Sequence, residues 1–446
     1  MGKYFGTDGF RGKANESLTA IHAFRVGRFL GKYYSQGKGE RARILIGKDT
    51  RLSSYMFEYA LAAGATASGA DVYLLHVTTT PSVSYLVHTE GFDCGVMISA
   101  SHNPYTDNGI KLFAGNGEKL EESVLSRVEE YIDGGALPLA TGEKIGRTID
   151  FVSGRNRYLA YLLSLPRTSF RGMRVGLDCA NGSAWQISKS IFDALGAKVY
   201  AIHAEPDGTN INVGCGSTHP EDLCALVQER SLDVGFAFDG DADRCISVDE
   251  RGRVVDGDGI LYACARSMHS RGELDGEGVV CTVMSNCGLK ESLAREGITL
   301  VQTEVGDKMV SEELVKSGYL LGGEQSGHII FRKHASTGDG ILTALKVMET
   351  MLENKCPLSC LTEGLKRYPQ RTVNVRVRDK EAILRNSEVM ECVERVRGGM
   401  SAGRVHLRAS GTEPVVRILV EGEDEGVCNT AIAEIERAVR SAEEGM

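Results

Sequence analysis

Short apolar runs that alternate with helical segments place the strongest limit on how this chain can fold. Residues 43–47, 71–77 and 94–99 have the length and composition of buried strands. Residues 54–68 and the stretch that begins at Pro81 lie between them and show the apolar spacing of helices. Parallel strands need a crossover of this kind, which is usually a helix. The order strand, helix, strand, helix, strand therefore predicts an α/β protein with a mostly parallel sheet.

The same alternation recurs twice before the pattern changes near residue 366. The second α/β stretch is predicted to have strands and helices at residues 174–178, 184–195, 198–203, 220–230 and 233–238. The third is predicted to have them at residues 259–269, 279–283, 288–296, 299–303 and 338–352. In the last stretch, expected strands at 373–377, 405–408 and 415–420 are interleaved with expected helices at 385–396 and 428–441. We expect three similar mixed α/β domains around a central cleft and a smaller C-terminal α+β domain, with bounds at 1–152, 153–254, 255–365 and 366–446.

Composition excludes several classes of protein. Hydrophobic residues make up 42% of the 446 residues and charged residues 25%, which is typical of a globular protein in water. A net charge of −9 argues against a nucleic-acid partner, and no apolar run approaches the roughly 20 residues that span a membrane. The 12 cysteines form no CxxC pair, and the N-terminus lacks the apolar core of a signal peptide. We therefore expect a cytoplasmic protein with reduced thiols.

The strand expected at residues 94–99 ends in an unusual polar loop. Ser99, Ser101 and His102 follow its apolar residues, and an Asn-Gly turn signal stands at residues 108–109, just before Lys111. Open α/β sheets bind ligands at the carboxyl ends of their strands, so this pattern suits a nucleophilic or phosphate-carrying serine. By position alone, Ser99 is an alternative to Ser101. A turn that merely ends a strand is the other interpretation.

Three aspartates follow the strand expected at residues 233–238. Asp239, Asp241 and Asp243 alternate, so a tight turn brings their carboxylates together, and a Mg²⁺ or Ca²⁺ ion would relieve the repulsion. An EF-hand is a competing interpretation, with Glu250 at the twelfth position, but Arg244 occupies the sixth place, which requires glycine. A solvated acidic hairpin is the remaining alternative. A metal site explains the pattern best.

Three further loops carry polar residues around glycines. Residues 6–12 are expected to form a glycine-rich turn that exposes Arg11. In the turn at residues 322–328, Glu324 and Ser326 can bind hydroxyl groups or an amine of a ligand, whereas His328 is equally explained as a loop histidine. The last loop suits a phosphate group, although an ordinary β-hairpin with edge charges would also explain any one of its residues. Its expected phosphate ligands are Arg408, Ser410, Gly411, Thr412 and Arg417.

Together these loops resemble the α-D-phosphohexomutase superfamily. The resemblance covers essentially the whole chain in the same order, at residues 6–12, 99–104, 239–244, 323–328 and 408–414. Gln325 and the stretches 206–212 and 215–218 are similar to the branch of the family that acts on glucosamine phosphates. Lys308 and Met309 depart from that branch, because arginine and tyrosine are usual at these positions.

The resemblance implies a function for each loop. It implies that Ser101 is a phosphoserine and that one Mg²⁺ is held by Asp239, Asp241, Asp243 and that phosphate. Arg11, Lys111 and Arg244 are then placed to stabilise charge on the transferred phosphoryl group. Lys111 or His102 would transfer a proton, and the residues do not distinguish between them.

The implied reaction interconverts glucosamine 6-phosphate and glucosamine 1-phosphate, which supplies the UDP-N-acetylglucosamine pathway. Glucosamine 1,6-bisphosphate would be both intermediate and primer, and the partner would be a phosphorylated amino sugar. A homodimer is common among similar proteins, although the residues themselves do not indicate an oligomeric state.

Three other functions share parts of this pattern. A phosphomannomutase/phosphoglucomutase would use the same residues on a different sugar. A Mg²⁺-dependent sugar phosphatase would lose its serine phosphate to water, whereas a mutase must exclude water. A non-catalytic phosphosugar-binding protein has no need of Ser101, Lys111 and three aspartates, which argues against it.

Overall fold

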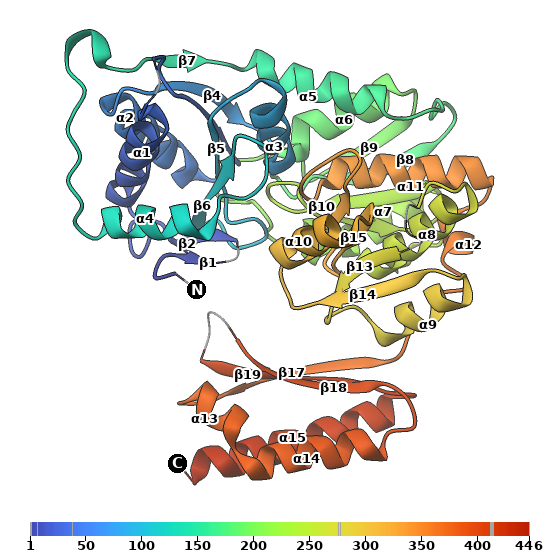
Figure 1. Cartoon of the computed structure of the whole chain (residues 1–446). Coiled ribbons are helices and arrows are strands. Elements are labelled where there is room, and N and C mark those ends of the chain that lie inside the picture. Colours follow the sequence, from blue (N-terminus) through green and yellow to red (C-terminus); the bar gives the residue numbers. More distant parts are fainter. Residues whose placement is uncertain are drawn as a thin grey trace. The chain divides into compact units, whose positions relative to one another are not determined.

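The computed structural model describes residues 2–6, 8–37, 39–274, 276, 278–410 and 414–445. They form two compact units, Met1–Met284 with Ile298–Glu363, and Ser285–Gly297 with Gly364–Met446 (Figure 1). The first unit contains three mixed sheets of seven, five and four strands, and the second unit contains one sheet of three strands. These sheets and their helices confirm the predicted fold class. Gly411 and Thr412, two of the expected phosphate ligands, lie outside the described residues.

The first module, residues 5–150, is built on a seven-stranded sheet with the order β1-β2-β6-β5-β3-β4-β7. The central strands β3, β4 and β5 are parallel, as predicted, and β7 also runs parallel to β4. The strands are β1 (Phe5–Gly6), β2 (Gly9–Lys13), β3 (Arg43–Lys48), β4 (Asp71–Val77), β5 (Cys94–Ile98), β6 (Asp107–Ala114) and β7 (Thr148–Asp150). The helical segments are α1 (Ala20–Ser35), α2 (Leu52–Ala67), α3 (Thr80–Thr89), α4 (Glu122–Ile132) and a short 3₁₀ turn at Gly142–Lys144.

Helices α1 and α2 lie side by side through glycines (Figure 1). A Cβ atom at Gly27 would stand 2.2 Å from the Leu61 carbonyl oxygen, and one at Gly64 would stand 2.1 Å from that of Phe24. The absence of side chains at these positions therefore lets the two backbones touch. The same glycines weaken the helical signal of the sequence, in which no element is predicted between residues 13 and 42.

The second module, residues 153–255, has a five-stranded sheet with the order β12-β11-β10-β8-β9. Its elements are α5 (Ser153–Ser164), β8 (Arg174–Asp178), α6 (Ala184–Ala194), β9 (Lys198–Ile202), a 3₁₀ turn at Gly216–Thr218, α7 (Glu221–Arg230), β10 (Val234–Phe238), β11 (Cys245–Val248) and β12 (Val254–Val255). The third module, residues 257–282 and 298–361, has a four-stranded sheet with the order β14-β13-β15-β16. Its elements are α8 (Gly257–Ser270), β13 (Gly278–Thr282), β14 (Thr299–Thr303), α10 (Asp307–Ser317), β15 (Leu321–Gly323), β16 (Ile329–Phe331), α11 (Gly340–Asn354) and α12 (Leu358–Leu361).

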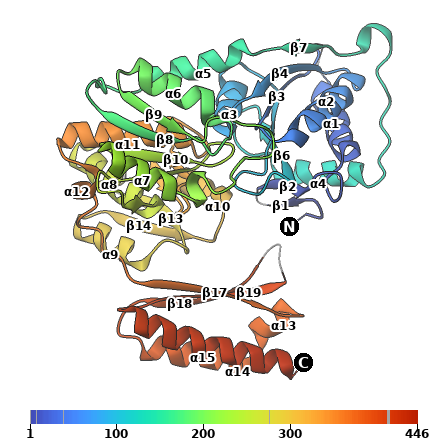
Figure 2. The same cartoon turned by 180° about the vertical axis from the view of Figure 1, so that it is seen from behind.

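The three modules share one topological feature that positions the polar loops. In each, a strand with a parallel partner is followed by a loop and then by an antiparallel neighbour: β5 by β6, β10 by β11, and β15 by β16. Figure 1 shows β5 and β6 of the first module, and Figure 2 shows β8, β9 and β10 of the second module from behind. We call the loops between these paired strands the serine loop (residues 99–106), the aspartate loop (residues 239–244) and the Glu324 turn (residues 324–328). The polar loops therefore occupy equivalent positions, although the sequence has no strict repeat.

Two local predictions are wrong, and a third needs a different starting residue. Asn108 and Gly109 form no turn but lie inside β6, where a Cβ at Gly109 would stand 2.4 Å from the Ser99 carbonyl oxygen. Residues 6–12 are not simply a turn, because β2 begins at Gly9 and pairs with β6. The helix predicted at 385–396 is present but begins at Ser387, because the Asn386 side chain caps it by accepting the Val389 N–H, and a separate short helix, Lys380–Arg385, precedes it.

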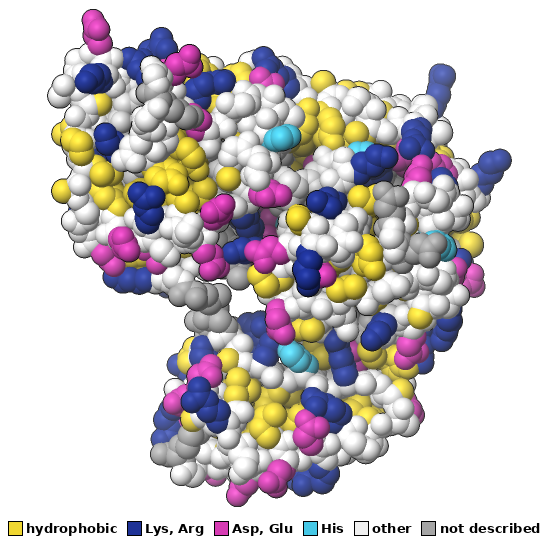
Figure 3. All heavy atoms as spheres, in the orientation of Figure 1, with side chains coloured by type: hydrophobic (Ala, Val, Ile, Leu, Met, Phe, Trp, Pro, Cys, Tyr) yellow, Lys and Arg dark blue, Asp and Glu magenta, His cyan; other side chains and the backbone are white. Residues whose placement is uncertain are grey.

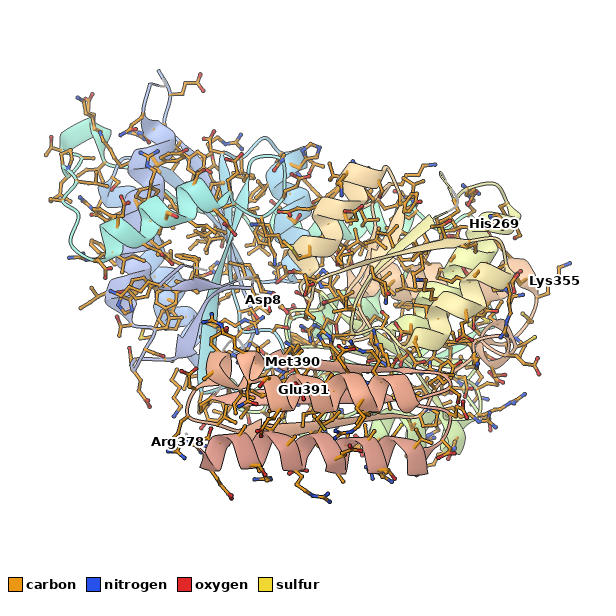
Figure 4. The ribbon with its side chains drawn as sticks, turned by 60° about the horizontal axis from the view of Figure 1, so that its bottom comes forward. Asp8, His269, Lys355, Arg378, Met390 and Glu391 are labelled. Carbon is orange, nitrogen blue, oxygen red and sulfur yellow. The ribbon has the colours of Figure 1, made fainter. Side chains whose placement is uncertain are left out.

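The second unit consists of the sheet β17-β19-β18 and the helices packed on it. Figure 4 shows α14 with Met390 and Glu391 on its exposed face. Buried Glu421 links this sheet to the first helix of the unit, because it accepts the Cys287 N–H at 3.0 Å and an Arg404 N–H at 2.8 Å. The elements are α9 (Cys287–Arg295), β17 (Gln370–Arg376), α13 (Lys380–Arg385), α14 (Ser387–Gly399), β18 (Arg404–Ala409), β19 (Val415–Glu421) and α15 (Glu425–Glu444).

Across the described residues of both units, none of the helices has the length and apolar character that crossing a membrane requires.

A buried carboxylate, Asp339, connects the second and third modules. It caps α11 by accepting the Leu342 N–H at 2.9 Å, and the Tyr158 hydroxyl of α5 donates to it at 2.6 Å. Burial disfavours the charged form and raises the pKa of Asp339 to about 6, despite these two hydrogen bonds. A raised carboxylate pKa costs stability once the pH exceeds the unfolded-state pKa of about 3.8.

We expect Asp339→Asn to relieve this cost. Asparagine is also a good N-cap and stays neutral at every pH. Between pH 3 and pH 7 the wild type should lose about 3 kcal/mol of stability that the variant keeps, because its pKa differs between the folded and unfolded states by about two units. Melting temperatures measured at several pH values test this. Parallel curves for the two proteins would contradict it.

Candidate active site

Ser101 lies in the loop that follows β5 and is fully buried. Its hydroxyl donates to Asp239 Oδ2 at 2.5 Å, and its Oγ lies 3.4 Å from His102 Nδ1. The backbone of Ser101 is left-handed, with φ of 54°, a conformation that costs a residue with a Cβ about 1 kcal/mol or more. The Ser101 N–H donates to Ser99 Oγ at 2.9 Å, so Ser99 supports the loop and does not face the aspartate as Ser101 does.

Two side chains hold the backbone of the serine loop. The buried guanidinium of Arg51 donates to the carbonyl oxygens of Ser101 and Asn103 at 3.0 and 2.6 Å. The amide of Asn212 donates to the same two oxygens at 2.9 and 3.1 Å. Asp49 in turn binds the Arg51 guanidinium. Neither Arg51 nor Asn212 is among the predicted site residues. Arg51 could have been found from the sequence, because it follows the carboxyl end of β3, and open α/β sheets bind ligands at the carboxyl ends of their strands.

The aspartate loop lies between β10 and β11 and receives hydrogen bonds from all three modules. Ligand oxygens of Asp239, Asp241 and Asp243 lie within 4.8 Å of one another, and all three side chains are buried. The loop is held through its main-chain carbonyls by the N–H groups of Thr80, Ser183 and Gly340, at 2.8 to 3.0 Å. The Thr80 hydroxyl also donates to Asp241.

The charge of this loop is incompletely neutralised by the described residues. Lys111, on β6, contacts Asp241 Oδ2 at 2.6 Å and Asp243 Oδ2 at 3.0 Å. Asp241 Oδ1 is buried and forms no hydrogen bond with any described residue. Three converging carboxylates with a free oxygen fit a divalent cation that prefers oxygen ligands. Glu250, required by the EF-hand alternative, binds Ser359 instead.

The aspartates differ in their electrostatic surroundings. Burial and the neighbouring Asp243 and Asp241 carboxylates raise the pKa of Asp239 well above its usual range. Burial acts in the same direction on Asp243, but Lys111 and His328 outweigh it and hold the pKa of Asp243 well below its usual range. The loop thus combines a carboxyl that resists ionisation with one that stays ionised, as expected for like charges in a small volume.

Cations surround the serine and aspartate loops. Arg11, on β2, lies 3.2 Å from Asp8, which Figure 4 labels near the junction of the modules of the first unit. Burial by itself lowers the pKa of Arg244, but the negative charges of Asp239 and Asp243 outweigh burial, so the pKa of Arg244 is raised. Burial, with Arg244 and Arg11, lowers the pKa of His102 to about 4, so its imidazole is neutral at pH 7.

The Glu324 turn lies between β15 and β16 and packs against the strand that follows the aspartate loop. Glu324 Oε1 accepts the Gly306 N–H at 3.2 Å, and burial raises the pKa of Glu324. His328 is no surface histidine: it is 3% exposed, and its Nδ1 lies 3.8 Å from Asp243 Oδ1. Ser326 is exposed on the same turn.

A cavity of about 280 Å³ opens beside these groups in the first unit. Its lining includes Asp8, Lys111, Lys119, Lys308 and Met309. Two ion pairs join the first and third modules beside it, Lys119 to Asp307 at 2.5 Å and Lys308 to Glu122 at 3.0 Å. Figure 3 shows acidic and basic side chains interspersed on this face of the first unit. The charged lining suits a ligand that carries charge of its own.

The predicted phosphate cradle belongs to the second unit. Arg408 on β18 stands directly opposite Arg417 on β19, and burial together with Arg417 lowers the pKa of Arg408. Ser410 is buried at the end of β18, and Lys380 Nζ donates to its carbonyl oxygen at 2.6 Å. Two facing guanidiniums favour a bound anion, because it relieves their repulsion.

A second group of potential metal ligands comprises Asp178, His203 and Cys215, and the Asp178 carboxylate already has other partners. Both Asp178 oxygens accept main-chain N–H groups at 2.9 Å, and His203 Nδ1 lies 3.0 Å from Asp178 Oδ2. His203 Nε2 lies 3.3 Å from Asp222. An imidazole between two carboxylates accounts for this cluster without a metal ion.

Comparison with known proteins gives the same domain order along the chain. Four domain families of phosphoglucomutase/phosphomannomutase match: alpha/beta/alpha domain I at residues 2–137, domain II at 156–252, domain III at 256–368 and the C-terminal domain at 373–438. Phosphoglucosamine mutase of Lachnoclostridium phytofermentans is 58% identical over 96% of each chain.

Solved structures show the same fold at low identity. A phosphoglucomutase/phosphomannomutase family protein from Burkholderia thailandensis has a TM-score of 0.81 at 23% identity and covers 99% of this chain and 98% of its own. N-acetylphosphoglucosamine mutase of Aspergillus fumigatus, solved with GlcNAc-6P and magnesium, has a TM-score of 0.70 at 18% identity, with 99% and 96% coverage.

We expect Mg²⁺ or Mn²⁺ to raise the melting temperature of the metal-stripped protein by several degrees. A cation that binds only the folded state stabilises it by about 2.7 kcal/mol at a hundred times its Kd. Asp241→Asn should remove most of this shift, whereas Asp193→Asn, on the exposed face of α6, should keep it. An equal shift in wild type and Asp241→Asn would contradict the assignment of the site.

Proposed function

Because this chain belongs to the phosphoglucomutase/phosphomannomutase family, we propose that it interconverts glucosamine 6-phosphate and glucosamine 1-phosphate through a phosphoserine at residue 101. The observation that carries the proposal is the Ser101 hydroxyl, buried 2.5 Å from Asp239 among three carboxylates and several cations. The phosphoglucosamine mutase relative supports the amino-sugar substrate. This relative is more than half identical, and the alignment covers nearly the whole chain.

In the active protein, Asp239, Asp241 and Asp243 would hold one Mg²⁺ together with the phosphate on Ser101. The ion would withdraw charge from the phosphoryl group and so favour its transfer. The free Asp241 Oδ1 supports this ligand set. Lys111 then has a second role, because its ammonium already contacts two of the carboxylates and can also reach charge that develops on a phosphoryl oxygen.

The reaction takes place in two transfers. In the first, O1 of glucosamine 6-phosphate attacks the phosphorus atom on Ser101, the bond to Ser101 Oγ breaks, and the proton of O1 passes to His102. The imidazole of His102 is neutral at pH 7 and can accept it, whereas burial of Lys111 is outweighed by Asp241 and Asp243, which raise the pKa of Lys111 and keep it a charged ammonium that cannot. The product is glucosamine 1,6-bisphosphate. In the second, the bisphosphate has turned around, Ser101 Oγ attacks the phosphorus at O6, and O6 regains a proton. Arg11 and Arg244 stabilise the transferred group in both directions.

Two groups of residues are assigned to recognition of the substrate. Glu324 and Ser326 would contact the sugar hydroxyls or the amine, since a carboxylate matches an ammonium group. Arg408, Ser410, Gly411, Thr412 and Arg417 would bind the phosphate that is not being transferred. The same phosphate ligands can serve O1 or O6, because each half-reaction presents a phosphate at the opposite end of the sugar.

Ser101→Ala should lower turnover by at least about a thousandfold, since it removes the group that carries the phosphoryl. Intact-mass measurement should find one phosphoryl group on the wild type and none on the variant. Ser99→Ala is the matched control: it removes a hydroxyl from the same loop, and the variant should keep its phosphoserine and part of its activity. Turnover by Ser101→Ala at the wild-type rate would overturn the assignment.

The ratio of kcat/KM for glucosamine 6-phosphate to that for glucose 6-phosphate should exceed about 10, because a hydrogen bond to a charged group is worth about 1.5–3 kcal/mol. Glu324→Gln should reduce this ratio, whereas Glu304→Gln, an exposed carboxylate on a neighbouring loop, should leave it unchanged. A ratio below one would assign the chain to a phosphoglucomutase, and release of inorganic phosphate alone would indicate a phosphatase.

A further inference from the structure

We propose that Asn212 is a positioning residue for the phosphoryl transfer at Ser101. Its amide ties the serine loop of the first module to the second module, which carries the aspartates. The inference rests on the proposed function, because it assigns Asn212 a part in that reaction. Asn212 belongs to the stretch 206–212, to which the active-site chemistry above gives no role.

The amide of Asn212 is fully engaged with the serine loop. Its Nδ2 has two hydrogens, and it donates to Ser101 O at 2.9 Å and to Asn103 O at 3.1 Å. Arg51 donates to the same two oxygens from the first module. Each carbonyl oxygen therefore accepts one hydrogen bond from the first module and one from the second module, which carries the aspartates.

Asn212 is itself held in one conformation. Its φ is 60°, in the left-handed region that asparagine tolerates better than most residues, and its N–H donates to Ala180 O at 2.9 Å. Two further hydrogen bonds connect the residues on either side of Arg51 in the first module to the second module. Thr50 Oγ1 donates to Asn181 O at 2.7 Å, and the Leu52 N–H donates to Gly208 O at 2.9 Å. The amide therefore approaches the serine loop from a fixed support.

Fixing these carbonyls fixes the position of the Ser101 hydroxyl. Ser101 has a left-handed backbone, and a Cβ at Gly240 would stand 2.6 Å from its carbonyl oxygen, so the two loops are in close contact there. Phosphoryl transfer requires the serine oxygen, the phosphorus and the sugar oxygen to lie in line, and a displacement of about 1 Å can cost about a hundredfold in rate. Without the amide of Asn212, Arg51 would be the only side chain of the described residues that donates to these two carbonyl oxygens.

Asn212→Asp tests this with a change of one group. It replaces the two N–H donors with a carboxylate oxygen that repels both carbonyls. Asn210→Asp is the matched control, because Asn210 lies in the same stretch 206–212 but its amide donates to the carbonyl oxygen of Glu205, just before that stretch, at 3.0 Å. Asn212→Gly is the second variant, since glycine accepts the left-handed backbone and removes only the side chain.

The measurement is a single turnover: enzyme that carries a ³²P-labelled phosphoryl group from labelled glucosamine 1,6-bisphosphate is mixed with saturating unlabelled glucosamine 6-phosphate, and the transfer of label from the protein to the sugar is followed. We expect the rate to fall at least about tenfold in Asn212→Asp and Asn212→Gly, whereas KM from steady-state rates over a range of substrate concentrations should be nearly unchanged. The ³¹P resonance of the phosphoserine should shift in both variants. Asn210→Asp should match the wild type in rate and in resonance.

The possible failures of the experiment are distinguishable. If the wild type transfers no phosphoryl group, the proposed function fails. If the wild type transfers normally and both Asn212 variants equal it in rate and resonance, the positioning role is overturned. If Asn210→Asp slows transfer as much as the Asn212 variants, the effect belongs to the whole segment, and the specific role of the Asn212 amide is overturned.

Discussion

The mutual repulsion of three buried carboxylates is the constraint on which the rest of the first unit depends. Ligand oxygens of Asp239, Asp241 and Asp243 lie within 4.8 Å of one another. Two ionised groups at this distance repel by about 3 kcal/mol at an effective dielectric constant of about 20. The loop persists because Lys111 contacts two of the carboxylates and because main-chain donors from all three modules hold its carbonyls. A bound cation would complete this compensation.

The recurring topology explains how three modules meet at one loop. In each module the polar loop joins a strand with a parallel partner to an antiparallel neighbour, so each loop leaves its sheet at an equivalent edge. Glycines then allow close approach between loops: Gly240 lies against Ser101, and Gly340 lies against Arg244. Positions that require glycine are therefore concentrated where the modules touch, and the reactive side chains project between them.

The sequence predicts the strands and the reactive residues better than it predicts the side chains that hold the serine loop in place. The strands at 71–77 and 174–178 are predicted to the residue, because a buried apolar run bounded by polar residues has few alternatives. The aspartates are predicted because three charges at alternate positions need compensation. Arg51 and Asn212 are missed, since their role depends on carbonyl oxygens of a loop that is distant in sequence. Asn108–Gly109 is misassigned because tertiary packing in β6 overrides a local turn preference.

The tracing of a ³²P label tests the central claim most directly. Phosphorylated enzyme with an unlabelled phosphoserine is incubated with Mg²⁺ and glucosamine 6-phosphate that carries the label in its phosphate. If Ser101 relays the phosphoryl group, the label appears in the bisphosphate, then on the peptide that contains Ser101, and then at O1 of other sugar molecules. Label that reaches O1 without ever entering the protein, or that is released only as inorganic phosphate, would contradict the account.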